Sequence, residues 1–177
     1  VLACLAGYGF SRYRFRGRKA MYAGLLYGQM MPSVVLIIPL YQMFSKIGLI
    51  DSYFSLILPD VVITVPLATL MLKSFFDGVP KALEEAARID GAKKTQVLLH
   101  IMLPIAKPGL VSVGIYTFLT TWEEFIFALN LTNSAAIRTL PIAIDMFKGE
   151  FVIDWGAIMA SGAVISLPAM LLFVLCN

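Results

Sequence analysis

Charged side chains are scarce in this chain of 177 residues, and long stretches lack them altogether. Only 14% of the residues are Asp, Glu, Lys or Arg, whereas about a quarter are charged in soluble domains. Four stretches hold no more than two charges each: 20–45, 52–72, 108–137 and 155–177. A helix needs about 20 apolar residues to cross a hydrocarbon core. Four such runs exclude a soluble globular domain and predict a polytopic membrane protein.

Cysteine, histidine and a nucleotide-binding loop are also scarce or missing. The two cysteines, Cys4 and Cys176, lie in apolar segments, where we expect small core residues and neither a disulfide framework nor a metal site. The single histidine, His100, is expected to be solvated or to lie at an interface. No Gly-x-x-x-x-Gly-Lys-Ser/Thr phosphate loop occurs, because "GAKKT" lacks the glycine spacing. We therefore expect no catalytic residue, no metal site and no bound cofactor, so that any ATP and Mg must bind to another chain.

The 14 Lys and Arg residues are distributed unevenly among the connections between the apolar runs. Five lie in residues 11–20, six lie in 73–107, and three lie in the other two connections. In that order they are Arg12, Arg14, Arg16, Arg18 and Lys19, then Lys73, Lys81, Arg88, Lys93, Lys94 and Lys107, then Lys46, Arg138 and Lys148. The positive-inside rule then predicts that loops 11–20 and 77–106 are cytoplasmic, whereas 46–55 and about 132–154 face outward. Topology and headgroup contact explain the basic run at 11–20, and we expect no nucleic-acid partner.

The apolar runs predict an all-α fold, with residues 1–177 in a single domain of membrane-crossing helices. The expected spans are about 1–10 (a partial span), 21–45, 56–76, 107–131 and 155–176. Prolines that we expect to kink these helices are Pro32, Pro39, Pro59, Pro66 and Pro168. Because the sequence begins at Val1 inside one apolar run and stops directly after another, we expect a fragment cut at both ends.

The strongly polar stretch is residues 84–104, EEAARIDGAKKTQVLLHIMLP, which is too charged to cross a membrane. It predicts a helix–turn–helix, in which Pro80 suits the first helical turn, Gly91 suits a left-handed helix end, and Pro104 ends a second short helix. One side of the first helix consists of small residues. An interfacial helix resting on lipid is one reading, but alanine buries little apolar area, so docking to a partner protein is favoured.

This stretch is similar to the cytoplasmic coupling loop of permease subunits in binding-protein-dependent ABC importers. The family pattern is Glu-Ala-Ala, three further positions, Gly, nine further positions and Ile-x-Leu-Pro. The matching residues here are Glu85-Ala86-Ala87, Asp90-Gly91-Ala92, Ile101, Leu103 and Pro104. Two positions depart from the pattern: Leu98, where an aromatic residue is frequent, and Lys93, where a small hydroxyl residue often caps the second helix.

The resemblance implies the ABC type I importer permease fold, here without its first helix and its C-terminal tail, in a cell inner membrane among lipids. It implies a loop that contacts an ATPase subunit through Glu84, Glu85, Ala86, Ala87, Asp90, Gly91, Ala92, Ile101, Leu103 and Pro104. The implied partners are a second permease subunit in a heterodimer, two ATPase subunits and an extracytoplasmic sugar-binding protein. This chain would then be a non-catalytic transport subunit, and ATP and Mg would bind to the ATPase subunits.

Residues 112–126, SVGIYTFLTTWEEFI, divide on a helical wheel into a polar side and an apolar side. The polar side and the adjoining tryptophan predict a substrate path: Tyr116, Thr120, Trp122, Glu123 and Glu124. At about 1.5 Å per residue from Lys107, Glu123 is expected roughly 24 Å along the helix, where carboxylates are costly and usually functional. The acids would accept hydrogen bonds from a polyol. Alternatively, the pair is solvated in the outer headgroup zone, with Trp122 as an interfacial anchor.

Three segments, TFLTTWEEFIFALNLT, IRTLPIAIDMF and DWGAIMASGAVISLP, resemble the carbohydrate branch of these importers, in particular the second permease of maltose-type systems. That subfamily typically has Trp-Asn-Glu-Phe where this chain has Trp122-Glu123-Glu124-Phe125, and the added acid argues against an anionic substrate. The resemblance implies a sugar importer subunit whose outer segment 132–154 meets the loaded binding protein. The alternatives are a permease for glycerol phosphate or another polyol, an ion-coupled secondary transporter, and a membrane scaffold that recruits a soluble protein.

Overall fold

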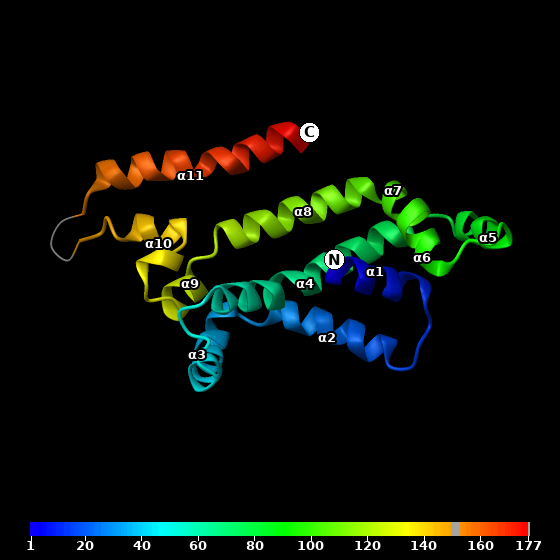
Figure 1. Ribbon diagram of the computed structural model, residues 1–177, viewed down its shortest axis with the longest axis horizontal. Helices are drawn as coiled ribbons and strands as arrows, with labels where there is room; N and C mark the ends of the chain where they lie inside the picture. The colour runs from blue at the N-terminus through cyan, green and yellow to red at the C-terminus, as the bar shows by residue number, and fades with distance from the viewer. Residues whose placement is uncertain (150–152, 177) are drawn as a thin grey trace. The chain divides into compact units, whose positions relative to one another are not determined.

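The computed structural model of the chain describes residues 1–149 and 153–176, and every regular element within them is a helix (Figure 1). Outside the helices, Lys148 and Ile153 form an isolated β-bridge. The expected all-α fold is therefore confirmed. In chain order the elements are α1 (Leu2–Arg12), α2 (Arg18–Met30), the 3₁₀ turn η1 (Ser33–Leu36), α3 (Ile37–Lys46), α4 (Tyr53–Asp77), α5 (Lys81–Ile89), α6 (Lys94–Val97), the π-helical turn η2 (Leu98–Met102), α7 (Leu103–Ile105), α8 (Lys107–Trp122), α9 (Ile126–Leu131), the 3₁₀ turn η3 (Ala135–Ile137), α10 (Leu140–Asp145) and α11 (Trp155–Cys176).

Two helices of the described chain are long and apolar enough to cross a membrane alone: α4, and residues Trp155–Leu175 of α11. Two bent pairs qualify only if each pair is counted as one span. Arg18–Met30 with Ser33–Lys46 is bent by 99°, and Lys94–Ile105 with Lys107–Trp122 is bent by 78°. The described residues thus offer up to four crossings.

Prolines have different effects in different helices. The expected span 21–45 is broken at Pro32, because a proline disfavours helical backbone at the preceding residue. Met31 accordingly adopts φ −75° and ψ 126° and ends α2. By contrast, α4 runs unbroken from Tyr53 to Asp77 through two prolines, and α11 continues through Pro168.

The helices form two compact units, each of which has its own core. The first unit comprises Val1–Met31 and Ile63–Thr117, and the second comprises Pro32–Val62 and the residues from Phe118 onward. The long helices α4 and α8 contribute residues to both units.

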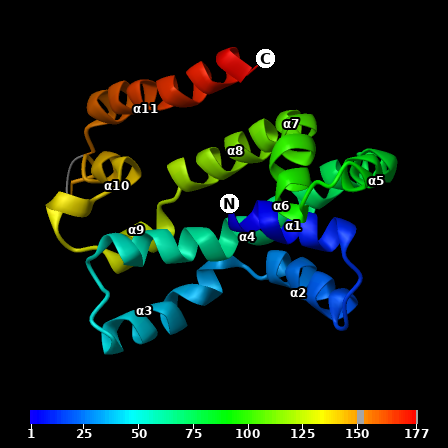
Figure 2. The ribbon, with the colours of Figure 1, turned by 45° about the vertical axis from the view of Figure 1, so that its right-hand side comes forward.

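In the first unit, α1 packs along the C-terminal half of α4 (Figure 1 and Figure 2). Side chains from α1, α4, α8 and the region between α4 and α8 form the core: Ala3, Tyr8, Ala68, Leu72, Phe76, Val79, Val97, Met102, Ala106 and Val113. The ring of Tyr8 packs edge-on against Phe76, with centroids 5.7 Å apart and an angle of 80° between the planes. Through this core, the helical segments of the polar stretch pack against α1 and α4.

Two glycines allow other helices to approach α4 closely. A Cβ on Gly7 of α1 would lie 3.1 Å from the Cβ of Leu72 and 3.1 Å from the backbone nitrogen of Lys73. A Cβ on Gly109 of α8 would lie 2.3 Å from the ring of Phe75. Small residues of this kind are the usual means by which membrane helices bring their backbones together. Both α1 and α8 therefore contact α4 where a larger residue would not fit.

In the second unit, α3 packs against α9. In the same unit, α10 lies beside α11 (Figure 2). The buried apolar side chains of this unit include Phe44, Pro59, Phe127, Ala128, Leu131 and Ile142. No residue of Trp155–Leu175 is buried, although this stretch of α11 has a mean hydropathy of 2.3. The apolar surface of α11 is therefore left for lipid or another protein to cover.

Replacement of Gly7 by Val is expected to destabilise the protein by about 1–3 kcal/mol, the usual cost of overpacking a close contact. The new Cβ would lie 3.1 Å from backbone atoms of α4, which would have to shift to relieve the contact. Gly9→Val is the matched control on the same helix, since nothing lies within 4 Å of a Cβ there. Thermal unfolding of the detergent-solubilised protein measures both variants, and equal midpoints would contradict the close packing of α1 on α4.

Candidate functional site

The polar stretch folds as a helix, a tight turn and a second helical segment, all within the first unit (Figure 1). Pro80 precedes the first residue of α5, and Asp90 follows its last. Gly91 then adopts φ +86°, and its N–H donates to the carbonyl of Arg88 at 3.1 Å. Glycine is favoured in this left-handed conformation because it has no Cβ to clash. The predicted helix end at Gly91 is confirmed.

The second helical segment is longer than the sequence predicted. Because α6, η2 and α7 follow one another without a break, the segment continues through Pro104 to Ile105. Pro104 therefore lies one residue before the end of the segment, and Ala106 follows as its C-cap. At the other end, the backbone N–H of Lys93 donates to Oε1 of Gln96 at 2.8 Å. Gln96 thus supplies one half of a capping box, although residue 93 has no hydroxyl group.

The turn between these segments presents an exposed surface of small residues. Of the residues expected to contact an ATPase subunit, Glu85, Ala86, Asp90, Gly91 and Pro104 are exposed, and Ala87, Ala92, Ile101 and Leu103 are half-buried. Beside them, Ile89 is 87% exposed. A shallow hollow of 410 Å³ follows the turn and is lined by Asp90, Gly91, Ala92, Gln96, His100 and Ile101. The exposed Ile89, the small residues and the neighbouring hollow together form a surface that another protein can cover.

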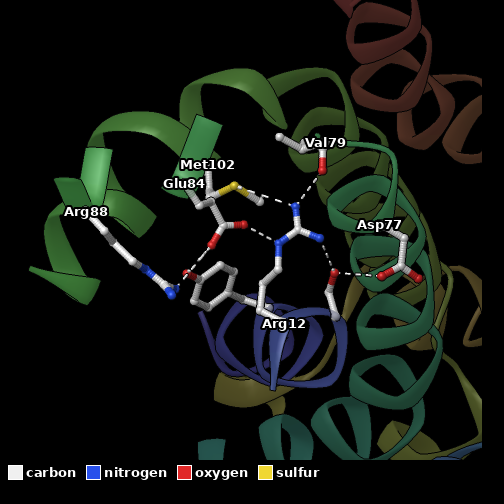
Figure 3. A network of polar contacts seen from close by, with 8 residues as sticks. Arg12, Asp77, Val79, Glu84, Arg88 and Met102 are labelled. Atoms are coloured by element: carbon white, nitrogen blue, oxygen red, sulfur yellow. Dashed lines mark hydrogen bonds and ion pairs between the residues drawn. The ribbon is translucent and has the colours of Figure 1, made fainter. Parts of the chain in front are cut away.

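Glu84 does not belong to this surface. Its residue is only 3% exposed, and its carboxylate faces α1 (Figure 3). Nε of Arg12 donates to Oε1, and the hydroxyl of Tyr8 donates to Oε2 at 3.2 Å. Nη2 of Arg88 lies 3.6 Å from the same Oε2. Groups of its own chain therefore surround the Glu84 carboxylate, unlike the exposed or half-buried residues that are expected to contact an ATPase subunit.

Arg12 is the centre of this buried cluster (Figure 3). Its side chain is 5% exposed, and its Nη2 donates to the carbonyl of Val79 at 2.8 Å. Its Nη1 donates to the hydroxyl of Ser11 at 3.0 Å, and that hydroxyl donates to Asp77 at 2.6 Å. The sequence analysis did not distinguish Arg12 from the other basic residues nearby. The signal that could have identified it is the spacing of Tyr8 and Arg12, which lie one turn apart on one face of α1.

The expected substrate-path residues lie around the end of α8, which stops sooner than predicted. The helix ends at Trp122, and Glu123 and Glu124 lie in the connection to α9. The predicted polar helix face therefore does not extend past Trp122, and the two acids do not share a helix. Tyr116 and Thr120 are half-buried and lie one turn apart on α8.

Glu124 is directed at the start of α9. Its Oε1 accepts a hydrogen bond from the N–H of Phe127 at 2.7 Å, and its Oε2 accepts one from the N–H of Ala128 at 3.0 Å. The first N–H groups of a helix have no partner within the helix, and the helix dipole favours a negative charge there. Glu124 thus caps α9, a role that the sequence analysis did not foresee.

Trp122 and Glu123 line a hollow of 510 Å³ within the second unit, together with Asp145 and Lys148. The indole Nε1 of Trp122 donates to the carbonyl of Ile165 at 3.0 Å, which fixes the orientation of the ring. Nζ of Lys148 lies 2.6 Å from Oδ1 of Asp145. The hollow therefore combines two aromatic side chains, Trp122 and Phe125, with two acids and one cation.

Asp51, in the connection between α3 and α4, holds the start of segment 132–154. Its Oδ1 accepts hydrogen bonds from the N–H of Ser134 at 2.8 Å and of Asn133 at 2.7 Å. These backbone donors, first Ser134 and then Asn133, hold the pKa of the Asp51 carboxyl below its usual range. Residues 150–152 of the segment, which is expected to meet a binding protein, lie outside the described residues. Its beginning is fixed to the neighbouring connection.

The chain is similar to a family of transport proteins over nearly its whole length. The model of the family "Binding-protein-dependent transport system inner membrane component" matches residues 1–176. The sulfoquinovosyl glycerol transport system permease protein SmoH of Agrobacterium fabrum is 35% identical over 175 residues, which cover 99% of this chain and 61% of the relative. The trehalose/maltose transport system permease protein MalG of Thermococcus litoralis is 35% identical over 175 residues, which cover 98% of this chain and 63% of the relative. The chain thus spans less than two thirds of the length of these relatives.

A solved structure also has this fold. It is the crystal structure of a bacterial ABC transporter involved in the import of the acidic polysaccharide alginate, with a TM-score of 0.76 over 99% of this chain and 70% of that chain. At 17% identity, the likeness concerns the fold alone. The resemblance to carbohydrate permeases, which rested on the motifs, is confirmed by the curated relatives. The chain therefore belongs to the inner membrane components of binding-protein-dependent transport systems.

Proposed function

We propose that this chain is a membrane-spanning subunit of an ATP-driven sugar importer and forms half of its translocation pathway. The observation that carries the proposal is the exposed turn of small residues around Gly91, on a chain whose sequence has no phosphate-binding loop. A transport subunit whose energy source lies on another chain needs a surface to which that chain can bind. The loops 11–20 and 77–106 then face the cytoplasm.

The partners in this proposal are a second permease subunit, two ATPase subunits and an extracytoplasmic sugar-binding protein. ATP and Mg bind to the ATPase subunits, and this chain holds no cofactor, metal or catalytic residue. This subunit undergoes a conformational change, because closure of the ATPase pair moves the 84–104 loop. The helices then rearrange between an inward-facing and an outward-facing pathway, and the nucleotide state shifts the balance between the two.

The proposed ATPase contact surface leaves out Glu84. It consists of the exposed or half-buried residues around the turn: Glu85, Ala86, Ala87, Asp90, Gly91, Ala92, Ile101, Leu103 and Pro104. Ile89, which is 87% exposed, adds an apolar side chain that a pocket on the partner can bury. Interfaces derive most of their binding energy from a few such central residues.

The proposed sugar path includes the hollow lined by Trp122 and Glu123. An indole ring offers a flat apolar surface to one face of a sugar, and a carboxylate accepts hydrogen bonds from its hydroxyl groups. Tyr116 and Thr120, farther back on α8, extend the path. The names of the relatives, one of which transports trehalose and maltose, support a sugar as the substrate class. Glycerol phosphate or another polyol is the alternative within the same transport class.

Reconstitution of the full-length protein with its ATPase subunits and binding protein in lipid vesicles tests this function. We expect the sugar-loaded binding protein to stimulate ATP hydrolysis and to produce ATP-dependent uptake of labelled sugar. Uptake that persists without the ATPase and stops when an ion gradient is dissipated would identify a secondary transporter instead. Assembly without either stimulated hydrolysis or uptake would leave a scaffold.

Gly91→Val is expected to weaken binding of the ATPase subunit by about tenfold, because a β-branched residue at φ +86° distorts the turn at a cost of about 1–3 kcal/mol. Gly17→Val is the matched control, since Gly17 has φ +85° and equally open surroundings but lies outside the contact surface. Co-purification of the ATPase subunit measures the effect. Equal retention of the subunit by both variants would contradict the docking role of the turn.

Glu124→Ala is expected to reduce sugar uptake while the complex still assembles, because α9 loses a cap worth about 0.5–2 kcal/mol. Glu124→Gln keeps an acceptor oxygen and is expected to retain most of the activity. Glu123→Ala removes an exposed acid from the hollow without removing a cap, so we expect a higher half-saturation concentration and an unchanged unfolding temperature. Wild-type uptake in both alanine variants would contradict a role in sugar transport for either acid.

A further inference from the structure

Arg12 connects α1 to the first turn of α5, although 72 residues separate it from Glu84 (Figure 3). We propose that this ion pair transmits movement of the 84–104 loop to α1, which makes Arg12 a positioning residue of the transport cycle. The inference rests on the proposed function, since that function assigns the docking of an ATPase subunit to the loop. It adds a connection that the covalent chain does not provide.

Only α4 and α8 are covalent neighbours of the loop. Between α1 and the loop the sequence places α2, α3 and the whole of α4, so α1 is joined to the loop through non-covalent contacts. The apolar contacts of the core are non-directional and hold the helices together without fixing a register. A charge-assisted hydrogen bond is directional, so it sets the position of the first turn of α5 against the end of α1.

The guanidinium group holds several elements at once. Nε binds Glu84 on α5, and Nη2 binds the carbonyl of Val79, in the turn that leads into α5. Nη1 binds Ser11, whose hydroxyl in turn binds Asp77 at the end of α4. Arginine can do this because its N–H groups lie in one rigid plane, whereas lysine offers a single ammonium group. Arg12 therefore fixes the end of α4, the turn and α5 in one arrangement around the end of α1.

Because both side chains are buried, a partial separation of Arg12 and Glu84 is unfavourable. The side chains of Arg12 and Glu84 are 5% and 4% exposed, respectively. If the two separate, each charge remains in a site from which water is excluded, which is strongly unfavourable. The next two residues of α5, Glu85 and Ala86, are exposed. The short helix α5 therefore exposes one face to a partner, and its opposite face is bound to α1. A displacement imposed on the exposed face of α5 thus moves α1 as well.

The experiment uses the full-length protein in its reconstituted complex, with the variants Arg12→Gln, Glu84→Gln and the double variant. Arg12→Gln leaves the buried Glu84 with only the more exposed Arg88, at 3.6 Å, as a cationic partner, and Glu84→Gln leaves the buried Arg12 without its carboxylate on α5. We therefore expect a low yield of assembled complex from each single variant. The double variant removes both charges and keeps side chains that can hydrogen-bond, so we expect the yield to recover. Sugar imported per ATP hydrolysed is nevertheless expected to fall about fivefold or more, the lower end of the coupling found between sites in allosteric proteins.

Arg16→Gln is the matched control, because Arg16 is an exposed cation in the same basic run, and we expect it to import as much sugar per ATP as the wild type. Arg12→Lys keeps both charges but loses the planar guanidinium group. We therefore expect the complex to assemble with this variant, even if the double variant fails to assemble. Its ratio of sugar imported to ATP hydrolysed should lie between those of the wild type and the double variant. A wild-type ratio in Arg12→Lys, or in an assembled double variant, would overturn the proposal. A wild-type complex without sugar-stimulated ATP hydrolysis would instead overturn the proposed function.

Discussion

A charge that has no access to water must keep its partner, and the structure around the 84–104 loop depends on this constraint. Arg12 and Glu84 are both buried, and the hydrogen bonds of Tyr8 and Ser11 complete the cluster. Buried ion pairs add little net stability compared with apolar packing, but the loss of one partner is severe. The Arg12–Glu84 pair instead determines the orientation of α5, because it sets which face of the helix is turned inward and which is left exposed.

Polar groups near the end of α8 follow the same logic. The Glu124 carboxylate accepts hydrogen bonds from the first free N–H groups of α9, and the indole N–H of Trp122 donates to a carbonyl of α11. Inside a membrane, an unsatisfied polar group is costly, so side chains complete the hydrogen bonds that the helix ends leave open. Glu123 is exposed and lines the hollow instead. Two adjacent acids thus have different surroundings, which accounts for the different outcomes expected when each is removed.

The features that the sequence predicted correctly are those with a local cause. The all-α fold follows from long apolar runs with few charges, and the helix end at Gly91 follows from backbone sterics. The features that it missed are contacts between distant residues and the end of a helix assumed to continue. The inward face of α5 is decided by Arg12, which no local pattern around Glu84 reveals. The wheel over 112–126 assumed a continuous helix, whereas α8 ends at Trp122 and Glu124 caps the next helix.

The last helix, α11, combines an uncovered apolar surface with polar side chains that are satisfied within the helix itself. The hydroxyl of Ser161 donates to the carbonyl of Ala157, and that of Ser166 donates to the carbonyl of Ala163. Neither serine therefore needs a neighbour to complete its hydrogen bonds. A helix of this kind can exchange acyl chains for a protein neighbour on its uncovered surface without breaking these bonds.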